Sequence, residues 1–498
     1  MNAQQVLAGL GWSATATVVS AAGQLVFMAV LARLLDPAAF GLMAMGLVVL
    51  RFAGVFSQMG FAQALIQRPQ LQAQDTTAAL LMALATGGTL YGVLLLTAPV
   101  FGTAFGTPEL PLLIGVLGLS LLLGTLGSLP LALLRRQARF KRVSGIEVLA
   151  FLIGYGAVGV ACALQGMGVW SLVAATLSQQ SLLLMLGFLS VRYPLSWPVS
   201  RSSVAGLWAY GSRYSLTGVL EFLYSNVETL FIGRNLGKVD LGLFNRAVTL
   251  TSLPVELGVS AVNKVLFPAL SGMQQDHRRM ADGFQMLLLS IGLFSTAVAC
   301  AIAAAGPDVV GLLLGAKWQG IAPLVAILAF AVPPAFMYVA CGVTLDSLAA
   351  LRPKLWLQAL MLALKVALVL WLARWGLIGI ACAVVLAEVA RLALGMRLVS
   401  RLLSIDAVVL WRQLALFIST GVTVWIVVGI AASASLAAGL PLLARVLLEA
   451  ATAAAALVGI VLWLLARYPA YAPLQRFDAV RRWHGRLLRA LRLRALYP

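Results

Sequence analysis

Residues 31–42 read LARLLDPAAFGL, and residues 232–243 read IGRNLGKVDLGL, at an offset of 201 residues. The alignment places Arg33 on Arg234, Leu35 on Leu236, Gly41 on Gly242 and Leu42 on Leu243. Each segment joins two long apolar stretches. A short junction that recurs in this way indicates that the chain contains an internal repeat.

A second match supports the repeat. At an offset of 208 residues, Gly168 aligns with Gly376 and Gln180 aligns with Glu388. Both offsets step over six apolar stretches, and an even step keeps the direction of the chain. The sequence therefore predicts two parallel copies, related by an axis along the normal of a membrane.

The composition excludes a soluble protein. Of the 498 residues, 62% are hydrophobic and 10% are charged, against about 45–50% and about 25% in soluble domains. The mean hydropathy is +0.99. The net charge of +19 comes from cations at the ends of apolar runs, without a basic groove for nucleic acid. The few cysteines and histidines predict neither a disulfide framework nor a metal site.

Apolar stretches of transmembrane length recur along the chain. A hydrocarbon core of about 30 Å needs roughly 20 helical residues, and only helices or closed barrels satisfy their backbone there. The stretches are too long for strands, so we predict fourteen transmembrane helices. Their expected ranges are 12–34, 40–66, 76–101, 110–134, 145–165, 168–190, 206–233, 240–265, 280–305, 321–348, 353–373, 377–400, 407–433 and 441–466.

Lysine and arginine are distributed unevenly among the connecting segments. If the N-terminus is cytoplasmic, 22 of the 35 cations fall in cytoplasmic segments and 6 in outside segments, the rest lying within helices. Cations are enriched in short cytoplasmic loops. We therefore expect both termini in the cytoplasm.

The sequence offers no catalytic machinery. Residues 154–159, GYGAVG, fit the dinucleotide pattern G-x-G-x-x-G, but they lie inside an apolar stretch without a preceding strand. No phosphate-binding G-x-x-x-x-G-K-[ST] motif occurs, and no serine lies near a histidine in the sequence. We predict a transporter, not an enzyme, with no cofactor and no metal.

Three predicted helices carry narrow polar faces, each within about 80° at 100° per residue. Hydroxyl groups alone would indicate hydrogen bonds between packed helices, whereas carboxylates at bilayer depth favour a hydrated cavity. The members are Ser13, Thr17, Ser20 and Gln24; Arg213, Thr217, Glu221, Tyr224 and Glu228; and Asn245, Thr249, Ser252, Glu256, Ser260 and Asn263.

Further charges lie near mid-depth. Arg51 lies about 15 Å from the outer end of the second helix at about 1.5 Å per residue, and the repeat aligns it with the polar face of the eighth helix. Gln58 shares its face. Lys365 and the pair of Glu388 and Arg391 are also at mid-depth. The pair is either a structural ion pair or part of the cavity.

The residues around both junctions resemble a known family. Residues 232–276, IGRNLGKVDLGLFNRAVTLTSLPVELGVSAVNKVLFPALSGMQQD, resemble the corresponding stretch of bacterial polysaccharide repeat-unit flippases of the Wzx/PST type. Residues 31–49, LARLLDPAAFGLMAMGLVV, are similar to their first junction. The resemblance covers about residues 10–400 in hydropathy and repeat order.

The resemblance implies an all-α polytopic membrane protein of the MATE-like fold, with two parallel six-helix lobes and two extra C-terminal helices. The expected parts are an N-terminal lobe, a C-terminal lobe, helices 13 and 14, and a basic amphipathic cytoplasmic tail. Their ranges are 1–200, 201–404, 405–466 and 467–498.

The same resemblance implies a function. It is the alternating-access transfer of an undecaprenyl pyrophosphate-linked oligosaccharide across the bacterial inner membrane, for an exopolysaccharide or O-antigen-like polymer. Arginine forks suit pyrophosphate, and hydroxyl, amide and aromatic groups suit sugars. The expected substrate-binding residues are Arg51, Gln58, Arg213, Tyr224, Asn245, Lys365 and Arg391. The expected coupling residues are Glu221, Glu228, Glu256 and Glu388.

Among these carboxylates Glu221 is the most central, and it is either the titrating group or part of a fixed structural hydrogen bond. The expected partners are the lipid-linked oligosaccharide, a polysaccharide polymerase and export machinery, and anionic lipids at the tail. A disordered tail that only sets orientation is the alternative for residues 467–498.

Three other functions stay open. They are a MATE-type cation-coupled drug exporter, a peptidoglycan-precursor flippase, and a membrane polymerase or ligase of polysaccharides. The last would need a large external loop with catalytic side chains, whereas the predicted outer segment 306–320 offers only Asp308 and Lys317.

Overall fold

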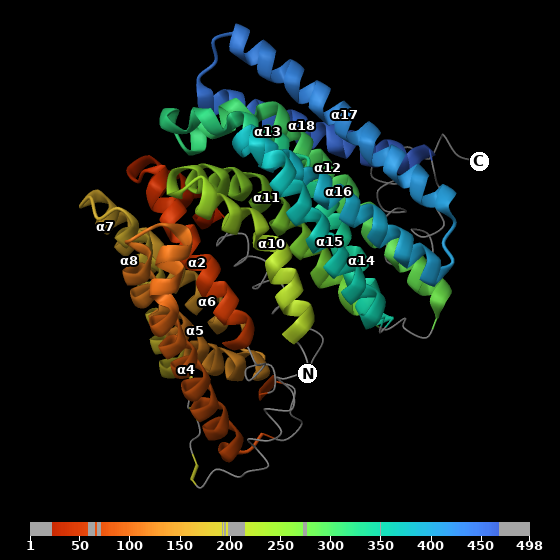
Figure 1. Ribbon diagram of the computed structural model, residues 1–498. Coiled ribbons are helices and arrows are strands. Elements are labelled where there is room, and N and C mark those ends of the chain that lie inside the picture. Colours follow the sequence, from red (N-terminus) through yellow and green to blue (C-terminus); the bar gives the residue numbers. More distant parts are fainter. Residues whose placement is uncertain are drawn as a thin grey trace. The chain divides into compact units, whose positions relative to one another are not determined.

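The computed structural model describes residues 22–57, 65–66, 71–191, 193, 196–197, 215–271, 276–348 and 350–467, which contain helices and no strand (Figure 1). This confirms the predicted all-α class. A helix Ala22–Leu34 comes first. The elements after it are α2 (Pro37–Ser57), α4 (Ala73–Phe105), α5 (Leu110–Arg136), α6 (Phe140–Phe151), η1 (Leu152–Gly159), α7 (Val160–Leu164), α8 (Val169–Ser190), α10 (Ser215–Asn235), α11 (Lys238–Ser271), α12 (His277–Leu313), η3 (Ala316–Ile321), α13 (Ala322–Ala329), α14 (Val332–Ser347), α15 (Leu351–Leu372), η4 (Ala373–Trp375), α16 (Gly376–Leu403), α17 (Ala407–Ala437) and α18 (Leu442–Arg467).

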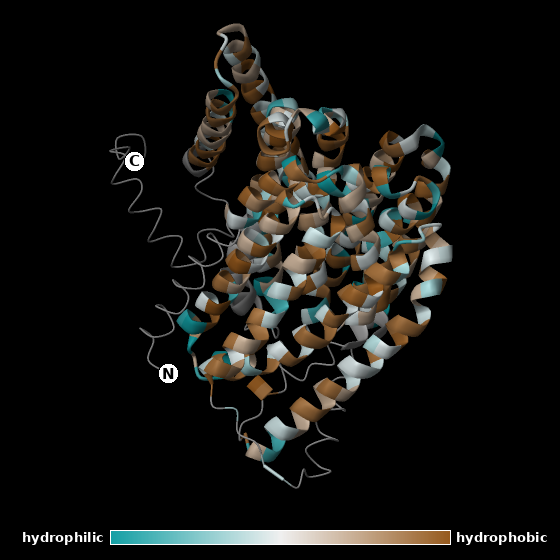
Figure 2. Cartoon of the chain, turned by 90° about the vertical axis from the view of Figure 1, so that its left-hand side faces the viewer, coloured by the Kyte–Doolittle hydropathy of each residue, from teal (hydrophilic) through white to brown (hydrophobic). Residues whose placement is uncertain are grey.

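The chain is a multi-pass membrane protein. Ten stretches of the described residues are long and apolar enough to cross a membrane, and hydrophobic residues predominate along the helices in Figure 2. Each of the fourteen predicted ranges contains described helical residues, but α10 and α11 are not among the ten stretches. Their polar faces lower their hydropathy. The count of fourteen crossings stays a prediction.

The chain divides into two compact units. The first comprises Met1–Ala247, Leu313–Ile321 and Lys365–Ala373. Within it α5 packs against α4 and α8, and α2 packs against α5 and α10 (Figure 1). One face of α5 is fully buried, with the spacing of an amphipathic helix. Its residues are Leu110, Leu113, Ile114 and Leu117.

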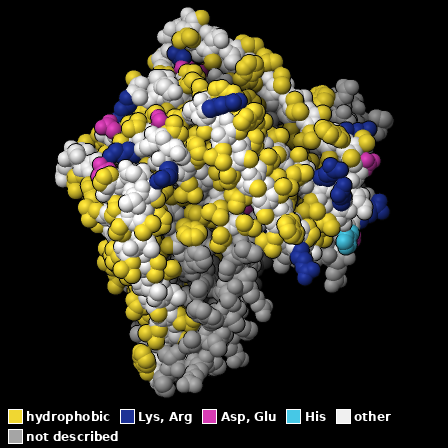
Figure 3. Space-filling model, viewed as in Figure 1, with side chains coloured by type: hydrophobic (Ala, Val, Ile, Leu, Met, Phe, Trp, Pro, Cys, Tyr) yellow, Lys and Arg dark blue, Asp and Glu magenta, His cyan; other side chains and the backbone are white. Residues whose placement is uncertain are grey.

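The second compact unit comprises Val248–Leu312, Ala322–Leu364 and Arg374–Pro498. Within it α16 packs against α13 and α14, and α17 packs against α18. Glycines let α12 and α17 approach closely, because a Cβ at Gly292 would meet the ring of Phe417. The face shown in Figure 3 is largely hydrophobic, with few charged side chains, as expected for a surface that faces lipid.

The dinucleotide-like glycines serve helix packing. Residues 152–159 form the π-helix η1 between α6 and α7, so they do not form a phosphate-binding loop. A Cβ at Gly154 would lie 2.8 Å from the backbone oxygen of Ala175 on α8. The glycine is therefore required for the close approach of η1 and α8.

The C-terminal end of α12 differs from the prediction. The helix continues to Leu313, whereas the sequence suggested an end at residue 305 and a loop over 306–320. The dipeptide Gly306-Pro307 reads as a helix end because proline disfavours the helical conformation of the residue before it. The structure keeps Pro307 inside the helix, and Asp308 is consequently helical and buried.

Candidate functional site

A buried cation lies in the first compact unit. The Nζ atom of Lys365 lies 2.8 Å from Oε2 of Glu228 and donates a hydrogen bond of 2.8 Å to the backbone oxygen of Tyr224. It also lies 4.5 Å from the centre of the Tyr224 ring. The side chains of Lys365 and Glu228 are only 2% and 12% exposed. The ammonium group is therefore engaged by a carboxylate, a carbonyl and a ring face.

The arrangement joins three of the residues that the sequence singled out. Tyr224 and Glu228 are four residues apart on α10 and so share one face, as the polar stripe requires. Lys365 approaches that face from α15. Because a buried ammonium group needs compensation, Glu228 serves as the counter-ion of Lys365.

Arg51 lies near the contact of α2 with α10. Phe52, its neighbour in sequence, packs on Phe222 with ring centres 5.3 Å apart. The Arg51 side chain itself is exposed and makes no hydrogen bond or ion pair with the part of the chain that the structure describes. Glu221, next to Phe222, is half-buried.

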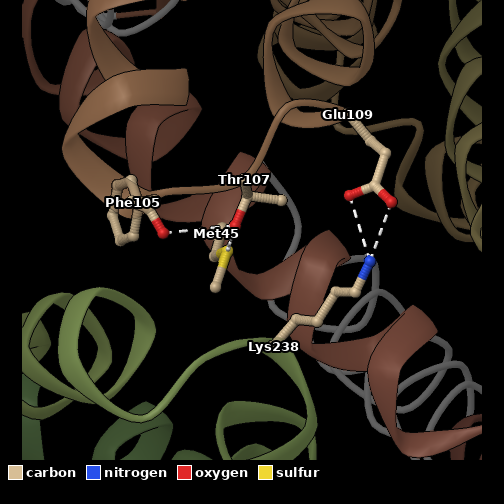
Figure 4. A network of polar contacts seen from close by, with 5 residues as sticks. All are labelled: Met45, Phe105, Thr107, Glu109 and Lys238. Carbon is tan, nitrogen blue, oxygen red and sulfur yellow. Dashed lines mark hydrogen bonds and ion pairs between the residues drawn. The ribbon is translucent and has the colours of Figure 1, made fainter.

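The two repeated junctions meet in one cluster, which we call the junction cluster: residues 32–41, 103–109, 233–246 and 315–318. Figure 4 shows four of its residues, Phe105, Thr107, Glu109 and Lys238. Lys238, at the start of α11, binds both carboxylate oxygens of Glu109, at 2.8 and 3.0 Å. Arg234 donates to the backbone oxygen of Ala104, and a Cβ at Gly233 would meet the ring of Phe105. The segment between α4 and α5 therefore docks on the second junction.

In the other half of the junction cluster, the segment after α12 contacts the first junction. The indole of Trp318, in η3, is fully buried and donates to the backbone oxygen of Ala32 at 2.8 Å. Lys317 donates to the backbone oxygen of Leu35 at 2.6 Å and lies 3.6 Å from Asp36. The segment after α12 therefore docks on the first junction. The offset of 201 aligns Ala32 with Gly233, so the contact of Trp318 with Ala32 is equivalent in the repeat to the contact of Phe105 with Gly233.

Two glycines form the centre of the junction cluster. A Cβ at Gly41 would overlap the backbone oxygen of Lys238, and a Cβ at Gly242 would overlap that of Pro37. The offset of 201 relates Gly41 to Gly242 and Pro37 to Lys238. The contact of Gly41 with Lys238 is therefore equivalent, under the repeat, to the contact of Gly242 with Pro37. Such a reciprocal pair of contacts is what twofold symmetry produces. Only glycine permits such an approach of two backbones.

Asn245 belongs to this cluster as well. Its Oδ1 accepts a hydrogen bond of 3.0 Å from Arg246, whose guanidinium lies 4.3 Å from the centre of the Phe40 ring. Phe40 in turn packs edge-on against Trp318, with ring centres 5.7 Å apart. The stack connects α11, α2 and η3.

The other predicted residues fall elsewhere. In the second compact unit, Arg391 lies 3.8 Å from Glu388 and 4.0 Å from the centre of the Tyr338 ring, and both charged side chains are 9% exposed. This arrangement agrees with the structural ion pair that the sequence left open. Glu256 is exposed. Gln58 and Arg213 lie outside the described residues. The binding and coupling roles themselves stay predictions.

Several residues of the junction cluster were not foreseen. Sequence reasoning placed Lys317 in an outer loop and did not single out Phe105, Glu109 or Trp318. The signal that would have found them is positional. A bulky aromatic lies at or shortly after the C-terminal end of a long helix, Phe105 as the last residue of α4 and Trp318 in η3 after α12.

A surface pocket of about 430 Å³ lies beside the junction cluster. Asp36, Glu109 and Lys238 contribute charges of both signs to its wall. None of the predicted substrate-binding residues is among the described residues that line it. The pocket is therefore distinct from the cluster of Lys365, Glu228 and Tyr224.

Comparison with known proteins identifies relatives of about two thirds of the chain. A family described as polysaccharide biosynthesis protein matches residues 30–323. The lipopolysaccharide biosynthesis protein WzxC of Escherichia coli (strain K12) is 26% identical over 326 residues, which are 65% of this chain and 66% of that protein. The succinoglycan biosynthesis transport protein ExoT of Rhizobium meliloti (strain 1021) is 27% identical, over 66% of each chain. The chain thus spans slightly less than two thirds of these relatives.

Two solved structures share the fold. The lipid II flippase MurJ in an inward closed conformation matches with a TM-score of 0.72 at 11% identity, covering 91% of this chain and 99% of MurJ. An inward-facing multidrug resistance transporter of the MATE family matches with a TM-score of 0.57 at 17% identity, covering 77% of this chain and 96% of that one. The expected MATE-like fold is thereby confirmed.

Proposed function

Because the chain belongs to the polysaccharide biosynthesis protein family, we propose that it is a flippase of the Wzx type in the bacterial inner membrane and moves a lipid-linked oligosaccharide. The substrate is an undecaprenyl pyrophosphate-linked repeat unit, which passes from the cytoplasmic to the periplasmic leaflet. Support comes from relatives named for lipopolysaccharide and succinoglycan biosynthesis, and from a neighbour in fold named lipid II flippase. The protein is a transporter, and it catalyses no chemical reaction.

The observation that carries a mechanism is the symmetric contact of Gly41 and Gly242 in the junction cluster. We propose that the two lobes, residues 1–200 and 201–404, rock about this contact to expose the substrate to each leaflet in turn. With both termini cytoplasmic, the cluster lies on the periplasmic side. In this proposal the junction cluster is the periplasmic closure, which opens during transport.

Opening of this closure is energetically accessible. The ion pairs of Lys238 with Glu109 and of Lys317 with Asp36 are partly exposed, and such pairs contribute about 0–1 kcal/mol each. Burial of a ring such as that of Phe105 contributes about 1.5–3 kcal/mol. A ligand that prefers the open state by a few kcal/mol can therefore shift the equilibrium.

The proposed binding groups differ in their availability. Arg51 is the best candidate for the pyrophosphate, because its guanidinium is exposed and near mid-depth. Lys365 and Arg391 are engaged by carboxylates and rings, so they contribute to the electrostatic potential along the proposed transport path. Tyr224 and Asn245 offer polar contacts to sugar. Glu221, Glu228, Glu256 and Glu388, all within the second lobe, are the proposed coupling groups.

Partners follow from the same proposal. A polysaccharide polymerase and export machinery would consume the translocated repeat unit. The basic C-terminal tail would bind anionic lipids of the cytoplasmic leaflet.

A clean deletion with lipid extraction tests the function. Cells without the protein should accumulate undecaprenyl-linked oligosaccharide in the inner leaflet and lose the polymer, while peptidoglycan precursors stay normal. Accumulation of peptidoglycan precursor instead would identify a precursor flippase. Unchanged polymer together with increased drug sensitivity would identify a drug exporter, and either result would refute the proposal.

A further inference from the structure

Two carboxyl groups are buried together in the second compact unit. Asp308 lies in the last two turns of α12, and Glu449 lies eight residues into α18. Asp308 pairs through Oδ1 with Arg445, which precedes Glu449 by four residues and so shares its face. Glu449 is buried one turn beyond Arg445 on the same face, and its carboxyl group interacts with that of Asp308. The three side chains form one cluster, which we call the α12–α18 acid pair.

The surroundings of Glu449 make its burial unusual. Residues such as Leu443, Leu447 and Val458 of α18 are exposed, as on a helix that faces lipid. Glu449 is 2% exposed, and it is the one buried residue among the described side chains of α18. The helix therefore directs a carboxyl group, rather than an apolar side chain, into the protein.

The charges of the acid pair do not balance. Two carboxylates face one guanidinium, that of Arg445. The charged residues of the packed helices α12 and α17 that remain, such as Asp282 and Arg412, lie more than 15 residues along their helices from Asp308 and from the α17–α18 turn, which is over about 20 Å at 1.5 Å per residue. With both carboxyl groups ionised, the cluster would hold one uncompensated negative charge.

Hydrogen bonding indicates how this charge is removed. Neither carboxyl oxygen of Glu449 has a hydrogen-bond partner within the described chain, and Oδ2 of Asp308 has none either. An uncompensated buried carboxylate is unfavourable by several kcal/mol. A single proton would neutralise the cluster, and the resulting O–H of one carboxyl group would donate to the other.

We propose that Asp308, Glu449 and Arg445 form a proton-binding site, in which one proton is shared between the two carboxyl groups and is exchanged during transport. The exchange rests on the proposed function, whereas the bound proton does not. Glu449 lies about 10 Å from the start of α18 at about 1.5 Å per residue, near the side that the predicted topology makes periplasmic. The sequence contains no ATPase motif and does not identify the energy source of transport. Proton uptake at this site would couple transport to a proton gradient.

Infrared spectroscopy of the full-length protein in lipid nanodiscs tests the bound proton. The wild type should show the stretching band of a protonated carboxyl group at neutral pH, and both Glu449→Gln and Asp308→Asn should lose it. Glu147→Gln is the matched control, because Glu147 forms an exposed ion pair with Arg135. A wild type without the band, or a band that persists in both variants, overturns the site. Stabilisation by sodium but not by acid would also overturn it, in favour of a metal cation.

Reconstitution tests the exchange. For one proton exchanged per lipid, an imposed pH gradient should shift the steady-state ratio of labelled lipid-linked oligosaccharide between leaflets by about tenfold per pH unit. Glu449→Gln should still equilibrate the lipid but lose this shift, and Glu147→Gln should keep it. An unchanged shift in Glu449→Gln overturns the coupling. Absence of lipid movement in every protein, with the infrared result intact, refutes the proposed function and leaves the proton site standing.

Discussion

Replacement of Lys365 by methionine isolates the buried ion pair. Methionine keeps the length of the side chain but removes the charge, so Glu228 stays at 12% exposure without its cation. The backbone oxygen of Tyr224 also loses its donor. Removal of one partner from a buried pair lowers the free energy of unfolding by about 3–5 kcal/mol. We expect a loss in this range for Lys365→Met.

The double variant gives the sharper test. Lys365→Met combined with Glu228→Gln removes both charges, and replacement of a whole buried pair is often neutral. The double variant should therefore be more stable than Lys365→Met alone, by about 2 kcal/mol or more. If the two substitutions caused independent packing defects, their losses of stability would add, and the double variant would be less stable than Lys365→Met.

Equilibrium unfolding of the full-length protein in mixed micelles of SDS measures these values. Arg135→Met is the matched control, since Arg135 lies 2.7 Å from Glu147 but the two side chains are 48% and 43% exposed. An exposed pair contributes about 0–1 kcal/mol. If Lys365→Met were no more destabilising than Arg135→Met, the buried pair would have no structural importance and the reasoning would fail.

Three further predictions concern transport and the junction cluster. Gly41→Ala should abolish polymer export, because its Cβ overlaps a backbone oxygen, whereas Gly88→Ala, with nothing within 4 Å of its Cβ, should leave export normal; polymer yield at equal membrane levels measures both. Arg51→Ala should weaken binding of the lipid-linked oligosaccharide by about 10- to 100-fold, as expected for loss of a charge-assisted hydrogen bond, and recovery by Arg51→Lys would argue against a bidentate contact. Trp318→Ala should lower the free energy of unfolding by about 3–5 kcal/mol, and a loss below 1 kcal/mol would show that its burial does not hold the junction cluster closed.

Sequence reasoning succeeded where hydropathy alone decides. The predicted range 377–400 agrees with α16, Gly376–Leu403, because Arg374 and Arg401 bound the apolar run. It failed at the end of α12, where Gly306 and Pro307 predicted a helix end but the helix continues to Leu313. Local signals at proline state a preference, and packing decides whether the helix continues.

Pairing of charges was harder to foresee. Glu228 and Lys365 were both recognised as mid-depth residues, but the sequence could not show that they pair, because they are far apart in the chain and depend on how α10 and α15 pack. Glu449 gave no signal of its own, since it was one charge near the end of a long apolar helix. Its significance comes from burial against Asp308, which only a three-dimensional structure reveals.

The most direct test of the account is translocation by the purified protein. Proteoliposomes should move a labelled undecaprenyl pyrophosphate-linked oligosaccharide between leaflets, and a reducible cross-link between Glu109→Cys and Lys238→Cys should stop this movement until it is reduced. The side chains of these two residues are in contact within the junction cluster, with Nζ of Lys238 2.8 Å from Oε1 of Glu109 (Figure 4). Undiminished movement in the cross-linked protein would contradict opening at the junction cluster, and no movement in any proteoliposome would contradict the flippase itself.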